Sequence, residues 1–113
     1  MTHSNDIQAV ELNIKRAKEL IDLGTALDHL RSNRDFKKVI IDGYFSDEAV
    51  RLVHLKGDPS MQGESSQTSI IKQMDSIASL YQYFFTIDMR ASSAARSVES
   101  DEETLSELLA EGV

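Results

Sequence analysis

Residues 70–98 read IIKQMDSIASLYQYFFTIDMRASSAARSV, and this stretch decides the fold. Within it, apolar or aromatic side chains recur at alternating intervals of four and three residues, with one acidic exception. The stripe consists of Ile70, Met74, Ile77, Tyr81, Phe84, Asp88, Ala91, Ala95 and Val98. This period predicts one long helix over residues 66–98, begun by a cap at Ser65 or Ser66, with one face packed against other helices.

The stripe is wider than a two-stranded seam needs, because Ile71, Ala78 and Phe85 lie beside it. A wide stripe suits contact with two neighbours. Beyond Asp88 its residues become small, so that another helix approaches closely there or little surface is buried. We predict a protein interface on this stripe, with these candidate residues: Ile77, Tyr81, Phe84, Phe85 and Asp88.

Asp88 interrupts the apolar pattern, and a buried carboxylate without a partner would be strongly destabilising. We therefore expect Asp88 to lie in water or to pair with a basic group, for which Arg16 and Lys18 are candidates. The alternative is that it fixes the register of an interface, as polar residues do in coiled coils.

A second long helix is predicted over residues 6–31, capped by Ser4 or Asn5. Its first stripe, at spacings of three and four, is Ile7, Val10, Ile14, Ala17 and Ile21. A second stripe, rotated by one residue, is Leu20, Leu23, Leu27 and Leu30. The helix therefore changes partner along its length or bends at Gly24.

Two short helices are predicted between the long ones, over residues 34–43 and 46–56, followed by an exposed loop at residues 57–68. Asn33 or Ser32 caps the first, and Ser46 caps the second. Gly43 ends the first helix, although the β-branched run at residues 39–41 also suits a strand. Four residues of this part are expected in the core: Phe36, Tyr44, Val50 and Val53.

These elements predict an all-α protein: a long antiparallel helical hairpin with two short helices between its arms, forming a small helical bundle. In this hairpin we expect three residues of each long helix to contact those of the other: Ile14, Ile21 and Leu27 of the first helix, and Ile77, Tyr81 and Phe84 of the second. Residues 1–98 are expected to form a single domain. Residues 99–113 are expected to be an acidic tail or a short helix.

The 113 residues carry a formal net charge of −7, and six acidic side chains without a basic one lie in residues 99–113. The first 98 residues are nearly neutral, with 12 basic and 13 acidic side chains. An acidic end on a balanced body repels phosphates, so we expect no nucleic-acid partner. The end is a solvated terminus or a docking segment for a basic partner.

The sequence contains little that would support catalysis. There is no cysteine, and His3, His29 and His54 lie outside any nucleophile or metal-binding motif. We therefore expect no enzyme, no cofactor and no metal site. With no apolar run near the roughly 20 residues of a membrane span, we expect a soluble, cytoplasmic protein.

Three parts of the chain can be compared with known families: residues 31–52, RSNRDFKKVIIDGYFSDEAVRL, residues 79–84, SLYQYF, and the acidic end. Together they resemble a family of small, uncharacterised proteins of tailed bacteriophages that are encoded near virion structural genes. The resemblance implies a phage protein that binds other proteins, and it transfers no site residues. It therefore covers most of the chain without specifying a chemistry.

Two functions follow as expectations. The first is a non-enzymatic phage protein that acts through protein–protein contacts, as a virion assembly factor or a minor virion component. Its partner would be a second copy of itself, a phage structural protein or both, and we expect a homo-oligomer without membrane contact. The alternative is a small acidic inhibitor that binds a host protein through its acidic end.

Overall fold

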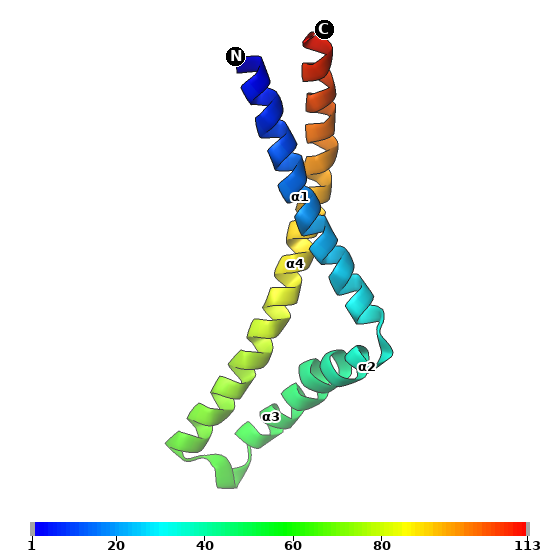
Figure 1. The fold of residues 1–113 in the computed structure, drawn as a ribbon. Helices are drawn as coiled ribbons and strands as arrows, with labels where there is room; N and C mark the ends of the chain where they lie inside the picture. Colours follow the sequence, from blue (N-terminus) through cyan, green and yellow to red (C-terminus); the bar gives the residue numbers. More distant parts are fainter. Residues whose placement is uncertain (1, 113) are drawn as a thin grey trace. The chain divides into compact units, whose positions relative to one another are not determined.

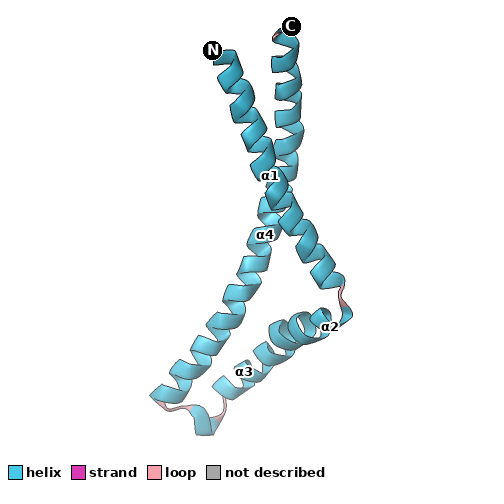
Figure 2. Ribbon diagram, in the orientation of Figure 1, coloured by secondary structure: helices cyan, strands magenta, loops and turns pink. Residues whose placement is uncertain are grey.

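The computed structural model describes residues 2–112, which are helical almost throughout (Figure 1, Figure 2). The order of elements is α1 (Thr2–Ser32), α2 (Arg34–Phe36), the π-helix η1 (Lys37–Asp47), α3 (Glu48–Lys56), the 3₁₀-helix η2 (Pro59–Met61) and α4 (Glu64–Glu111). None of the described residues lies in a strand, which confirms the all-α class, and residues 39–41 belong to the π-helix.

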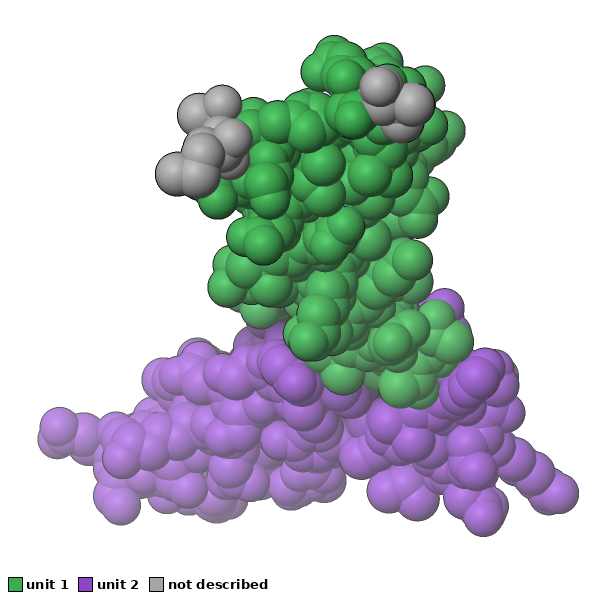
Figure 3. Space-filling view, turned by 45° about the horizontal axis from the view of Figure 1, so that its top comes forward, with its two compact units in different colours: residues 1–27, 86–113 green, residues 28–85 purple. Residues whose placement is uncertain are grey.

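The chain divides into two compact units (Figure 3). Unit 1 consists of residues 1–27 and 86–113, and unit 2 consists of residues 28–85. This differs from the expected division into residues 1–98 and 99–113, because residues 99–111 continue α4 and belong to unit 1.

Unit 1 is an antiparallel pair made of α1 and the second half of α4, with both ends of the described chain at the same end of the pair (Figure 1). The predicted helical hairpin is thereby confirmed. Its most buried side chains are Ile14, Ala17, Leu27, Ile87 and Ala94. A Cβ atom built on Gly24 would lie 2.5 Å from the Cβ of Ala91, so the two helices pass in close contact where both residues are small.

Helix α4 is longer than predicted, since it begins at Glu64 and ends at Glu111. The expected end near Val98 was wrong. No glycine or proline interrupts residues 64–111, and half-buried Leu105 and Leu108 continue the apolar spacing. A loop was also expected to reach residue 68, but α4 begins at Glu64 and the amide of Gln67 donates to the carbonyl of Gly63 at 2.9 Å.

Unit 2 pairs η1 and α3 with the first half of α4, which runs in the opposite direction (Figure 1). Its core contains Leu52, Ile70 and Ile77, of which the first two have no exposed surface. Half-buried side chains surround this core: Tyr44, Phe45, Ala49, Leu55, Met61 and Met74. Full burial of Leu52 and Ile70 stabilises the unit by about 1.5–3 kcal/mol each.

The residues expected to contact each other across the hairpin fall in different units. Ile14 and Ile21 belong to unit 1, whereas Ile77, Tyr81 and Phe84 belong to unit 2. Within unit 1, α1 is paired with the residues of α4 after Phe85. The small side chains beyond residue 90 permit that pairing, because they let two helices approach closely.

Two of the four expected core residues of the short helices are exposed. Val50 is 52% exposed and Val53 is 56% exposed, whereas Leu52 is buried completely. Phe36 and Tyr44 are half-buried. Helix α3 is apolar on most sides, so its sequence left open which side faces α4.

The predicted break between the two short helices is absent. Gly43 and Ser46 both lie within η1, which passes directly into α3, so neither the stop at Gly43 nor the cap at Ser46 exists. A Cβ atom on Gly43 would lie 3.0 Å from the carbonyl oxygen of Lys38. The wider turn of a π-helix brings that carbonyl close, and glycine leaves room for it. The cap at Asn33 is confirmed, since its side chain accepts from the amide of Phe36 at 2.9 Å.

Candidate interaction surface

The five predicted interface residues differ in how far they are exposed. Ile77 is 7% exposed and Phe84 is 9% exposed, so both belong to the interior of unit 2. Tyr81 and Phe85 are 54% and 51% exposed. Asp88 lies in unit 1, half-buried and engaged in an interaction.

This settles one expectation for Asp88, which is not a buried carboxylate without a partner. Within unit 1, the buried residues nearest to it along α4 are Ile87 and Ala94. Lys18, one of its two expected partners, has its Nζ atom 3.6 Å from a carboxylate oxygen of Glu102. The apolar seam of unit 1 therefore passes beside Asp88 and not through it.

An aromatic cluster holds Tyr81 in place. The ring of Phe45 meets those of Tyr81 and Phe84 edge to face, with centroid distances of 5.5 Å to both and interplanar angles of 80° and 72°. The ring centroid of Phe36 lies 6.0 Å from that of Phe84. Such geometries are the preferred ones for aromatic pairs. Tyr81 is thus fixed on one side by Phe45 while about half of its surface stays open.

The π-helix explains how both phenylalanines before α3 reach α4. Phe36 and Phe45 are nine positions apart, which is two turns of a π-helix at about 4.4 residues per turn rather than the 3.6 of an α-helix. Periodicity alone does not reveal this side of the cluster, because under α-helical spacing Phe36, Ile40 and Tyr44 share a face.

A groove runs between α3 and α4 beside this cluster. Its volume is about 260 Å³, and it is lined by Phe45, Ala49, Val53, Met74, Ile77, Ala78, Tyr81 and Gln82. None of these residues is charged, and their polar groups are the Gln82 amide and the Tyr81 hydroxyl. We call this hollow the α3–α4 groove.

A second apolar stripe on α4 borders the groove. It consists of Ile71, Met74, Ala78, Tyr81 and Phe85, at spacings of three and four. Ile71, Tyr81 and Phe85 are between 45% and 54% exposed. The wide stripe of this helix was predicted to serve two neighbours; in unit 2 its exposed side is uncovered, so that prediction stays open. The groove and this stripe together form what we call the open face of unit 2.

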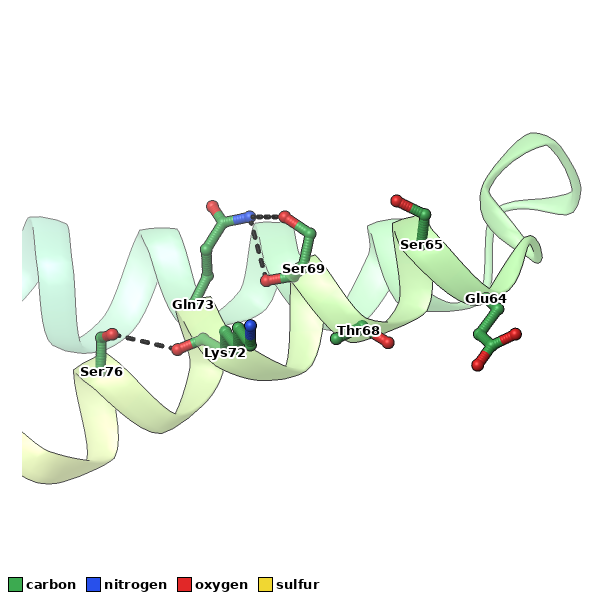
Figure 4. A pocket seen from close by; sticks show the side chains of 7 residues that line it. All are labelled: Glu64, Ser65, Thr68, Ser69, Lys72, Gln73 and Ser76. Carbon is green, nitrogen blue, oxygen red and sulfur yellow. Dashed lines mark hydrogen bonds between the residues drawn. The ribbon is translucent and has the colours of Figure 1, made fainter.

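Another hollow on α4 is polar and lies on a single helix (Figure 4). The Ser76 hydroxyl donates to the carbonyl of Lys72 at 3.0 Å, and the Gln73 amide lies 3.4 Å from the carbonyl and hydroxyl oxygens of Ser69. Because these groups bond to their own helix, they do not converge on a common point. This surface has the character of a solvated helix face.

Charge is distributed unequally between the two units. Unit 2 has seven basic and eight acidic side chains, a net charge of −1, whereas unit 1 has five basic and eleven acidic ones, a net charge of −6. In unit 2, Arg51 donates to both carboxylate oxygens of Glu48 and thereby lowers the pKa of that carboxyl. The open face itself carries no charged side chain.

The histidines do not gather into a site. His29 lies in α1 and His54 in α3, and across residues 2–112 no group of three or more histidine or carboxylate side chains is placed to hold a metal ion. Within the same residues, no helix combines the length and apolar character that crossing a membrane requires.

Comparisons of the chain with protein-family models, with curated proteins and with solved structures found no match.

Proposed function

We propose that this chain is a non-enzymatic phage protein that acts through contacts with other proteins, as a virion assembly factor or a minor virion component. The observation that carries the proposal is the open face of unit 2, where Tyr81 and Phe85 are about half exposed beside an uncharged groove. Contiguous apolar surface of this kind is typical of protein-interaction sites. The resemblance of residues 31–52 to small phage proteins supports the connection with the virion.

The test is to follow the tagged chain through an infection and to separate proheads, mature virions and soluble protein. We expect the chain in proheads or virions, and we expect Tyr81→Lys to reduce its incorporation at least fivefold, because a charge on the open face must be desolvated on docking. Tyr83→Lys is the matched control, since Tyr83 is also 54% exposed but points from another side of α4. A strictly monomeric chain that is absent from both particles contradicts the proposal.

A second candidate function is a small acidic inhibitor of a host protein. The net charge of −6 on unit 1 favours it, because such a surface attracts a basic or nucleic-acid-binding partner. The immobilised chain would then retain one host enzyme at low salt and release it at high salt. Retention that does not respond to salt contradicts this function.

A further inference from the structure

We propose that a second copy of this chain docks on the open face of unit 2, so that two copies of unit 2 form a four-helix bundle around a two-fold axis. This rests on the proposed function, since it names the partner of the same surface. In this arrangement the two α4 helices cross, antiparallel, at Ala78.

Unit 2 has few fully buried large side chains for a unit that is stable by itself. Among the described residues, Leu52 and Ile70 are the large side chains that are fully buried, and both belong to this unit. Two paired helical segments bury a single stripe between them, whereas helical domains usually enclose a core from more sides. A second layer of helices would cover the residues of this unit that remain open, among them Val53, Tyr81 and Phe85.

The exposed apolar area is of the right size for an interface. With about half of their surfaces exposed, Tyr81 and Phe85 each offer roughly 100 Å². Together with Val53 and Ile71, the open face supplies roughly 400 Å² from large apolar side chains, about half of the 800 Å² per partner in a standard interface. Interfaces are a little more than half apolar, so the polar flanks of α4 would supply the remainder.

The pattern of the second stripe is close to self-complementary, as a two-fold interface requires. Ala78 is small and central, and Ile71 and Phe85 lie seven residues before and after it. In an antiparallel crossing at Ala78, Ile71 of each copy meets Phe85 of the other. Tyr81 and Asp75, three residues after and before Ala78, meet at the polar edge of the crossing, outside the uncharged stripe, where the Tyr81 hydroxyl would donate to the exposed Asp75 carboxylate.

Charge favours pairing through unit 2 over pairing through unit 1. Two copies of unit 2 bring together a charge of −1 each, whereas two copies of unit 1 would bring together −6 each. Repulsion over the Debye length of about 10 Å at 0.1 M salt is therefore small for the first arrangement and large for the second. An uncharged face also offers no electrostatic attraction to a strongly basic or acidic partner. It matches a helix whose apolar stripe is equally uncharged.

The first experiment measures the mass of the full-length chain in solution by sedimentation equilibrium over a range of concentrations. We expect a dimer, and we expect Tyr81→Lys to raise its dissociation constant at least tenfold. Tyr83→Lys should change it less than twofold, because residues 81 and 83 point about 160° apart on an α-helix. A monomeric wild-type chain, or equal effects of the two variants, overturns the proposal.

The second experiment uses the absence of cysteine in this chain. In Ala78→Cys the two thiols would lie across the two-fold axis, within the roughly 4 Å between Cβ atoms that a disulfide requires. Mild oxidation should convert this variant to a covalent dimer, and Ser76→Cys, on the opposite side of α4, should remain uncrosslinked. This pair does not depend on Tyr81→Lys retaining its fold, and crosslinking of both variants alike contradicts the crossing at Ala78.

The two proposals fail separately. A monomeric chain that is nevertheless found in virions rejects the second copy as partner and leaves the proposed function standing. A dimeric chain that is absent from proheads and virions rejects the proposed function and leaves the dimer standing.

Discussion

Gly24 is a position where one missing carbon atom sets the distance between two helices. It is buried in unit 1, and its absent Cβ would fall 2.5 Å from the Cβ of Ala91. Real side chains do not approach so closely, so any larger residue must push α1 and α4 apart. Packing and intrinsic helix propensity therefore oppose each other at this residue.

We expect Gly24→Ala to lower the free energy of unfolding by about 1–3 kcal/mol, the usual effect of overpacking. Intrinsic helix propensity alone would raise it by about 1 kcal/mol. Urea unfolding followed by circular dichroism measures the outcome. The double variant with Ala91→Gly restores the clearance and should recover most of the loss; if Gly24→Ala stabilises the protein, the close approach is incorrect.

Asp58 organises the connection between α3 and α4. Its carboxylate accepts from the hydroxyl of Ser60 at 2.6 Å and from the amide of Ser60 at 2.8 Å. Hydrogen bonds from the hydroxyl, and then from the amide, lower the pKa of the Asp58 carboxyl below its ordinary value. The ionised form is thus favoured in the folded state.

Because the folded pKa is lowered, the stabilisation by Asp58 is present above the unfolded pKa of about 3.9 and is lost as the pH falls through the folded value. NMR titration of the carboxyl measures this pKa directly. We expect Ser60→Ala to raise it part of the way to the ordinary value, since the amide bond remains. An unchanged pKa in Ser60→Ala would show that the hydroxyl does not bond to Asp58.

At the level of elements, the π-helix η1 determines what α4 meets. It joins α2 to α3 without a break and turns Phe36 and Phe45 toward α4, where they contact Phe84. Each π-helical turn is less favourable than an α-helical one, so η1 depends on this aromatic packing and on the space at Gly43.

We therefore expect Gly43→Ala to destabilise unit 2, because its Cβ would press on the Lys38 carbonyl at 3.0 Å. The expected loss is about 1–2 kcal/mol by urea unfolding, with weaker near-ultraviolet circular dichroism from the aromatic cluster. Gly57→Ala is the matched control, since its Cβ would lie at an ordinary 3.7 Å from the nearest atom in a right-handed conformation. Equal effects of the two substitutions would argue against the π-helix.

At the level of the whole molecule, the uneven charge produces repulsion within α4. Four glutamates, Glu99, Glu103, Glu107 and Glu111, follow one another at intervals of four residues on its last turns. Like charges at this spacing destabilise a helix by about 0.2–0.5 kcal/mol per pair, and the negative end of the helix dipole adds to this effect. The exposed Lys18–Glu102 pair offsets little of it.

Replacing Glu103 by lysine removes two like-charge pairs and creates two opposite ones, so Glu103→Lys should raise the free energy of unfolding by about 0.5–1.5 kcal/mol at low salt. The gain should shrink at about 1 M salt, where the Debye length is about 3 Å. Parallel urea titrations at both salt concentrations measure it. A gain that is the same in both would mean that packing, and not charge, is responsible.

Much of the fold could be predicted from the sequence, because helix formation depends on neighbours within one or two turns. The spacing in residues 70–98, the cap at Asn33 and the small residues after Asp88 led to an all-α hairpin with a close helix pair. The broad apolar stripe of α4 could be predicted, but not which of its side chains stay exposed. Tyr81 and Phe85 are exposed on the open face of unit 2, while Ile77 and Phe84 face inward.

The tertiary structure decided which side of each helix is covered. An apolar stripe as broad as that of α4, or an α3 that is apolar on most sides, offers several faces, and the partner helix selects one of them. That selection buries Leu52 and leaves Val53 exposed. Tertiary contacts also determined that residues 37–47 form a π-helix and that α1 pairs with the second half of α4. They depend on contacts between residues far apart in the chain, such as Phe45 with Tyr81 and Gly24 with Ala91, for which local periodicity contains no signal.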